Sequence, residues 1–368
     1  MNDDPTTTTT SAANFYTMNP INSTIFSVAA AIYTIAAAIY CMIMGSPVVK
    51  KVTPAKTSEG RRRVAVITGS NTGIGLATAT ALVLHHNVDV ILACRSREKA
   101  TKAAETINVA AASANVSARA QFLHPCDLSS FDSVKEFAKV FREKYKTLDI
   151  LINNAGVNNT TEGRTTDNLE LIFQSNVLGH FLLTKSLIDL FPDNGHGRIV
   201  TLSSVAHHFV SSSATLDEIY WKELAKLNTS KSSFLPSYLR TVFEDSMQSY
   251  PPSKLATLLF AKELNARFGS SQRQQNSNSK KQIRAFAVNP GAVASDIWRS
   301  FPSITQPFIQ RIFLSTNQGC ATSVAAAMGE FQADEFYLQP YWMPESACHT
   351  PPYPVIEMMV RVLLFCIC

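Results

Sequence analysis

The sequence predicts an α/β fold in which helices cover both faces of a parallel, doubly wound sheet. From residue 64 onward, short apolar runs rich in β-branched residues alternate with longer helical stretches. A glycine-rich turn follows the first run, and polar residues gather after several later ones. This alternation is typical of parallel sheets, because each crossover between parallel strands needs a long connection such as a helix.

The expected elements follow in order along the chain. Six strands are predicted, with Phe336–Gln339 as a seventh: Val64–Thr68, Val88–Ala93, Ala120–His124, Leu148–Ile152, Arg198–Leu202 and Ile283–Val288. The helices are expected at Ile74–His85, Glu98–Ala112, Ser130–Lys144, Asp167–Leu190 and Ser249–Phe268. Two polar stretches interrupt the alternation, namely Leu216–Asp245, an expected insertion beside the site, and Gly269–Lys281, an expected solvated loop.

The composition limits the possible functions. Hydrophobic residues make up 46% of the 368 residues, charged residues 17%, and the net charge is +5. Average proteins carry about 25% charged residues, so this balance argues against a largely disordered or nucleic-acid-binding chain. The seven cysteines form no pair or cluster with zinc-ligand spacing, so neither a metal site nor disulfides are expected.

The N-terminal region predicts a membrane anchor. No charged side chain occurs from Pro5 to Val49, and the apolar run Ile25–Met44 would span about 30 Å as a helix. Basic residues follow this run, which predicts a cytosolic catalytic domain. A cleaved signal peptide lacks its usual basic start here, and an organelle-targeting segment is the other alternative.

Five regions are therefore expected. They are a disordered segment (1–24), a transmembrane anchor (25–44), a basic linker (45–61), a catalytic domain (62–345) and an apolar C-terminal tail (346–368). The chain is expected to cross a membrane once, and the endoplasmic reticulum is the expected membrane.

The turn after the first strand predicts a dinucleotide site. Glycines let backbone N–H groups approach a pyrophosphate, and the N-terminus of the next helix favours its negative charge. The expected cofactor-binding residues of this turn are Gly69, Ser70, Asn71, Gly73, Ile74 and Gly75. After the second strand, Arg95 stands where NAD-binding proteins carry a carboxylate, which favours NADP(H) over NAD(H).

Tyr250 and Lys254 form a candidate acid/base pair. Their spacing of four residues puts both side chains on one face of a helix. A neighbouring ammonium lowers the pKa of a phenol, which suits it to proton transfer. Because Pro251 and Pro252 follow the tyrosine, the pair is expected at the start of its helix.

Together these motifs resemble the short-chain dehydrogenase/reductase family, in its retinol dehydrogenase-like branch. Further elements agree in the right order: Asp127-Leu128, Asn154-Ala155-Gly156, Asn176, Ser204 and Pro290-Gly291. The resemblance implies a Rossmann-type fold and makes Asn176, Ser204, Tyr250 and Lys254 the catalytic set. It implies cofactor contacts for Asp127, Leu128, Asn154, Ala155, Gly156, Tyr250, Lys254, Pro290 and Gly291. Ser295-Asp296 departs from the family's pattern, where a threonine is common.

The expected reaction is hydride transfer between NADP(H) and an alcohol/carbonyl pair. The resemblance makes Tyr250 the proton donor and acceptor, Lys254 the ligand of the nicotinamide ribose, Ser204 the partner of the reacting oxygen, and Asn176 the anchor of a water. A lipophilic small-molecule substrate and a membrane are the expected partners. A vestigial NADP-sensing scaffold, or a reductase of a sterol, fatty-acyl or tetrapyrrole carbonyl, stays open, as does the oligomeric state.

Overall fold

A computed structural model describes residues 60–158, 163–209, 246–269, 282–298 and 313–331, with residues 307, 310–311 and 335–338. Within these residues, seven parallel strands form one sheet in the order β3-β2-β1-β4-β5-β6-β7. The strands are β1 (Val64–Thr68), β2 (Asp89–Ala93), β3 (Ala120–Gln121), β4 (Ile150–Asn153), β5 (Gly197–Leu202), β6 (Ile283–Val288) and β7 (Tyr337–Leu338). The order reverses between β1 and β4, where doubly wound sheets bind their ligands.

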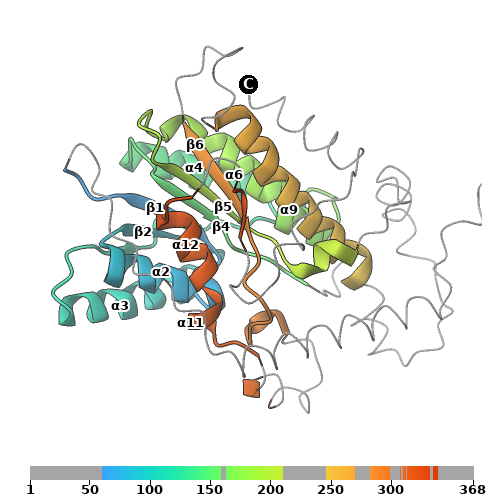
Figure 1. Cartoon of the computed structure of the whole chain (residues 1–368), viewed down its shortest axis with the longest axis horizontal. Coiled ribbons are helices and arrows are strands. Elements are labelled where there is room, and N and C mark those ends of the chain that lie inside the picture. Colours follow the sequence, from blue (N-terminus) through green and yellow to red (C-terminus); the bar gives the residue numbers. More distant parts are fainter. Residues whose placement is uncertain are drawn as a thin grey trace, which may run out of the picture.

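Helices cover both faces of the sheet (Figure 1). One layer contains α2 (Gly73–His86), α3 (Arg97–Ser113), α11 (Thr316–Gly319) and α12 (Ala321–Met328). The other contains α4 (Phe131–Lys144), α6 (Gly179–Leu187) and α9 (Ser246–Phe268). Each layer packs on its own buried hydrophobic cluster. The predicted doubly wound α/β fold is therefore confirmed.

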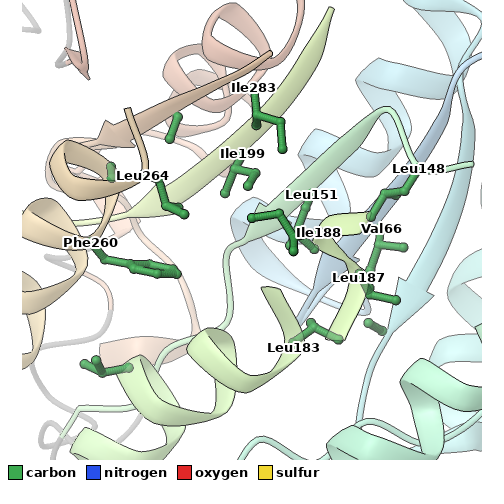
Figure 2. Close-up of a cluster of buried hydrophobic side chains, with 14 of the residues drawn as sticks. Val66, Leu148, Leu151, Leu183, Leu187, Ile188, Ile199, Phe260, Leu264 and Ile283 are labelled. Atoms are coloured by element: carbon green, nitrogen blue, oxygen red, sulfur yellow. The ribbon is translucent and has the colours of Figure 1, made fainter. Parts of the chain in front are cut away.

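Alternation along the strands builds the two clusters. Val64 and Val66 belong to the α4/α6/α9 side, whereas Ala65 and Ile67 between them belong to the opposite side. Successive side chains of a strand point to opposite faces, so a strand buried on both faces has to be apolar throughout. Figure 2 shows the first cluster, in which strand residues such as Leu151 and Ile199 face Leu187 and Phe260.

The predicted element boundaries need small corrections. β3 ends at Gln121 instead of His124, because only Ala120 and Gln121 pair with β2 at this edge of the sheet. The single helix predicted over Asp167–Leu190 is divided into α5 (Leu171–Phe173), a π-helical turn η2 (Gln174–Leu178), α6 and a 3-10 turn η3 (Ile188–Leu190).

A buried carboxylate joins the amino ends of the central strands. Asp149, which precedes β4, is 1% exposed and accepts two hydrogen bonds from the Arg61 guanidinium, at 2.7 and 2.8 Å. Its Oδ2 also accepts the backbone N–H of Val64 at 2.8 Å. This ion pair therefore lies at the amino ends of the strands, on the opposite side of the sheet from their carboxyl ends.

No helix in the described ranges is long and apolar enough to cross a membrane. The predicted anchor at 25–44, the segment before it, the linker up to residue 59 and the C-terminal tail lie outside the described residues. The same holds for the predicted insertion at Leu216–Asp245 and for most of the loop at Gly269–Lys281.

Candidate active site

The glycine-rich turn between β1 and α2 has no room for a side chain at Gly69 or Gly75. Gly69 has φ +61°, in the left-handed region, and a Cβ at Gly75 would collide with the Asn154 side chain and the Gly69 carbonyl. Thr72 precedes α2 but makes no side-chain bond to cap it. The N–H groups at the start of α2 therefore remain available to an anion, so this turn fits the pyrophosphate of a dinucleotide.

Two exposed arginines follow β2. Arg95 and Arg97 are both exposed, and the Arg97 guanidinium lies 5.2 Å from the centre of the Phe122 ring. Ser96 caps α3 by accepting the Lys99 N–H at 3.3 Å. Arg95 stays the predicted partner of a 2′-phosphate here, and the Ser96 hydroxyl is engaged by its helix.

The turn after β4 is bonded to the turn after β1. The backbone N–H groups of Asn154 and Ala155 both donate to Thr68 Oγ1 at 2.9 Å, and Asn154 Nδ2 donates to the Thr68 carbonyl at 2.8 Å. A Cβ at Gly156 would lie 3.3 Å from Lys254 Nζ and 3.6 Å from Asn176 Oδ1. The turn after β4 therefore places the glycine-rich turn, which we call the cofactor cradle, beside two predicted catalytic residues.

The predicted adenine contact lies after β3. Asp127 Oδ1 accepts hydrogen bonds from the backbone N–H and the hydroxyl of Ser129, at 3.0 and 2.6 Å. Leu128 is buried, and its backbone packs closely against Gly179 on α6. Both residues lie at the carboxyl side of the sheet, as predicted for a cofactor site.

Asn176 lies in the π-helical turn and is 1% exposed. Its Oδ1 accepts the Val157 N–H at 2.8 Å, and its Nδ2 donates to the Val157 carbonyl and to Ser253 Oγ, both at 3.0 Å. These bonds occupy the side chain with protein groups. They hold the turn at Val157 and the first turns of α9 in place. This positioning effect is separate from the predicted role of Asn176 as the anchor of a water.

Lys254 is 4% exposed, and its Nζ donates to the Leu202 carbonyl at 2.9 Å. The Nζ lies 5.4 Å from the centre of the Tyr250 ring. Burial lowers the pKa of Lys254 to about 8. Ser203 Oγ also donates to the Lys254 carbonyl at 2.7 Å, so the end of β5 is bonded to α9 on both sides of this lysine.

Tyr250 and Ser204 come from α9 and from the end of β5, respectively. A hydrogen bond between their side chains lowers the pKa of Tyr250, but burial outweighs it and raises that pKa to about 12. The expected decrease toward neutrality is therefore wrong for this structure. The reason is that the tyrosine hydroxyl is desolvated while the Lys254 ammonium is bonded to the Leu202 carbonyl.

The start of α9 also differs from the expectation. The helix begins at Ser246, so Tyr250 lies in its second turn and both prolines fall inside the helix. Proline removes a helical N–H, and these two cannot bond to the carbonyls of residues 247 and 248. Next to them, Ser253 Oγ donates to the Tyr250 carbonyl at 2.7 Å, which connects the backbone of Tyr250 to the hydrogen bonds of Asn176.

The turn after β6 completes the site. Gly291 has φ +82°, and its N–H donates to Asn289 Oδ1 at 3.0 Å, which shapes the predicted Pro290-Gly291 element. Val293 then pairs with Leu314 in a parallel bridge. This bridge brings the segment before α11 next to the Pro290-Gly291 element.

Three polar residues of this region were not predicted as site residues. Thr68 and His180 connect the cofactor turn to Asn176, and Ser253 connects Asn176 to Tyr250. A local signal existed for His180, which follows Asn176 by four residues and so shares its helix face. The partners across the fold have no such signal.

The sequence is similar to those of known proteins. A family model described as short chain dehydrogenase matches residues 63–215, which include the cradle, Asn176 and Ser204. Retinol dehydrogenase 12 of Mus musculus is 36% identical over 278 residues, 73% of this chain and 74% of that protein. Retinol dehydrogenase 11 of Homo sapiens is 32% identical over 295 residues, 78% of this chain and 81% of that protein.

Solved structures share the fold. A short chain dehydrogenase from Burkholderia cenocepacia J2315, in complex with NADP, matches with a TM-score of 0.53. The sequences are 19% identical, and the match covers 79% of this chain and 98% of that one. At this identity the likeness concerns the fold alone.

Proposed function

The chain belongs to the short-chain dehydrogenase family, in its retinol dehydrogenase-like branch, and is an NAD(P)-dependent oxidoreductase. From this premise we propose that it interconverts a lipophilic alcohol and its aldehyde or ketone with NADP(H), while anchored in a membrane by residues 25–44. A retinoid-like substrate is favoured because the relatives are named retinol dehydrogenases. The uncharged run Ile25–Met44 supports the anchor.

The cofactor would be held by groups described above. The α2 N-terminus and the glycine turn fit its pyrophosphate, Asp127 its adenine, and the exposed Arg95 a 2′-phosphate, which supports NADP(H). When bound, NADP(H) supplies or accepts the hydride. The protein's task is to orient the substrate and to move one proton.

Tyr250 would perform the proton transfer. A tyrosine whose pKa lies at about 12 is protonated at cellular pH, so in the reductive direction its hydroxyl can donate to a developing alkoxide. Ser204, which already bonds to that hydroxyl, would hold the same substrate oxygen. The Lys254 ammonium would stabilise the phenolate that forms and hold the ribose hydroxyls.

The contact between Ser204 and Tyr250, with Lys254 Nζ 5.4 Å from the tyrosine ring, carries the proposal. It brings together three residues from two elements in the combination that carbonyl reduction needs. The proposed catalytic residues are Asn176, Ser204, Tyr250 and Lys254.

Replacing the tyrosine hydroxyl tests this mechanism. In the full chain purified in detergent, Tyr250→Phe should reduce turnover of all-trans-retinal or an aliphatic aldehyde with NADPH by roughly 10²- to 10⁴-fold. NADPH binding should be unchanged. Tyr145→Phe is the matched control, because this half-buried tyrosine bonds to Gln121 on α4's side of the sheet, away from the site.

Two results would redirect the proposal. Equal turnover by Tyr250→Phe and the wild type would remove Tyr250 from the chemistry. A wild type that binds NADPH but reduces nothing in a broad carbonyl panel would favour the NADP-sensing scaffold, and turnover confined to a sterol, fatty-acyl or tetrapyrrole carbonyl would reassign the substrate.

A further inference from the structure

His180 lies inside the protein between the cofactor turn and the catalytic asparagine. It is on α6 and is 2% exposed. Its Nδ1 lies 2.9 Å from the Asn176 carbonyl oxygen, and its Nε2 lies 2.8 Å from Thr68 Oγ1. Each ring nitrogen therefore has one partner, and the two partners belong to different parts of the site.

The Asn176 contact determines the tautomer of the ring. A carbonyl oxygen can only accept, so Nδ1 carries the proton that bonds to Asn176. Burial lowers the pKa of His180 to about 4, and the positive charge of Lys254 acts in the same direction, so the ring is neutral at cellular pH. Nε2 of a neutral ring protonated on Nδ1 is an acceptor.

This tautomer directs the hydroxyl of Thr68. The hydroxyl has one proton, which goes to Nε2 at 2.8 Å and not to the Ile152 carbonyl at 3.4 Å. Its lone pairs are then free to accept the N–H groups of Asn154 and Ala155, each at 2.9 Å. All the hydrogen-bonding groups of this cluster are matched in a single arrangement.

We propose that His180 is a positioning residue that sets the cofactor turn and the catalytic asparagine in one common arrangement through its two ring nitrogens. The inference rests on the proposed function, since it assigns the turn to a dinucleotide. One side runs through Thr68 to the Asn154 turn that supports the cradle. The other runs through Asn176, whose side chain bonds to Ser253 and so to the Tyr250 backbone.

Two substitutions separate the two sides. An asparagine at 180 retains a donor near the Nδ1 position, whereas a glutamine reaches the Nε2 position with an acceptor oxygen. His180→Asn should keep the Asn176 bond and release Thr68, raising the Kd of NADPH about tenfold with little change in kcat. His180→Gln should keep the Thr68 bond and release Asn176, lowering kcat about tenfold with a nearly unchanged Kd.

The measurements use the full chain in detergent, with NADPH binding followed by fluorescence and turnover by NADPH absorbance. His196→Gln is the matched control, because this histidine is exposed and lies at the opposite, amino edge of β5. In a double-mutant cycle, Thr68→Val should weaken NADPH binding by a larger factor in the wild type than in His180→Asn.

A purely structural role predicts a different pattern. His180→Asn and His180→Gln would then lower stability and change Kd and kcat by equal factors, and this result would overturn the proposal. Wild-type behaviour of both variants would overturn it as well.

A spectroscopic test does not depend on how the variants fold. The ¹⁵N NMR spectrum of the labelled wild type, with the His180 signals assigned by their loss in a variant, should show a neutral ring protonated at Nδ1. A ring protonated at Nε2, or on both nitrogens at pH 7, would overturn the proposal. If the wild type binds no NADPH, the proposed function fails while the tautomer still decides this inference.

Discussion

The Thr72 hydroxyl donates a hydrogen bond of 2.9 Å to Asp296 instead of capping α2, the helix that it precedes. Asp296 lies in the loop after β6, in the 3-10 turn Asp296–Trp298, and the neighbouring Ser295 packs near Gly73. The bond therefore joins the cofactor turn to the loop that follows Pro290-Gly291. It also places a carboxylate near the helix end that is proposed to receive a pyrophosphate.

Neutralising Asp296 should tighten NADPH binding. Asp296→Asn retains an oxygen that can accept from Thr72 but removes a negative charge near the proposed phosphate site. We expect the Kd of NADPH to fall about threefold at low salt and this gain to shrink as salt is added. Thr72→Val, which removes the hydrogen bond but keeps the charge, should raise the Kd. Equal Kd values for Asp296→Asn and the wild type would show that the carboxylate does not face the phosphates.

A side chain at Gly75 should block the cradle. Gly75→Ala places a Cβ against the Asn154 side chain and the Gly69 carbonyl, so the two turns have to separate. NADPH binding, measured by calorimetry, should weaken more than about tenfold. Gly163→Ala is the matched control because nothing lies within 4 Å of its added Cβ. Unimpaired binding in Gly75→Ala would contradict the assignment of this turn.

Arg95 should determine the preference for NADP(H). Arg95→Ser removes the exposed guanidinium at the end of β2, and we expect the Kd of NADPH to rise about tenfold while that of NADH stays the same. Arg97→Gln is the comparison, since that guanidinium lies over the Phe122 ring. An equal rise in the Kd values of NADPH and NADH would show that Arg95 attracts both cofactors through its charge and does not recognise the 2′-phosphate.

Burial of Lys254 should make stability depend on pH. Its pKa is lowered to about 8 in the folded protein from 10.5, so the unfolded chain binds more protons between these values. Its contribution to stability therefore increases as pH rises from 8 to 10.5, and the full penalty applies below pH 8. Lys254→Met should raise the thermal unfolding midpoint at pH 7, by an amount that decreases toward pH 10.5.

The unfolding midpoints of Lys254→Met and the wild type, measured from pH 7 to 10, check this expectation. A difference that stays constant with pH would mean that the lysine's burial is not the cause. Turnover should be lost in the variant at every pH, because the ammonium is part of the proposed catalytic set.

Sequence patterns predicted the sheet well because its strands depend on local composition. Runs such as Ile283–Val288 are apolar apart from Arg284 and are bounded by polar residues, and this strand has the predicted limits. Helix interiors were predicted for the same reason. The glycine turn, Arg95 and the Tyr250/Lys254 pair were recognisable because each motif is contiguous or lies within one helix.

The remaining features depend on partners far away in the chain. The bond from Thr68 to His180 joins residues 112 positions apart, and that from Asn176 to Ser253 joins residues 77 positions apart. Local patterns contain no information about such pairs. The π-helical turn that carries Asn176, and the direction of the Tyr250 pKa shift, likewise follow from how distant segments enclose the site.

The Arg61–Asp149 contact has a mechanical consequence for the proposed N-terminal membrane anchor. Tension on the chain ahead of Gly60 would reach a bidentate ion pair and the adjoining β1 and β4 ladder, which resist shear together. The helix that carries Tyr250, α9, contains neither partner of this ion pair and no residue of β1 or β4. In the proposed membrane-anchored state, the proposed catalytic groups can therefore keep their geometry while the domain moves about its attachment.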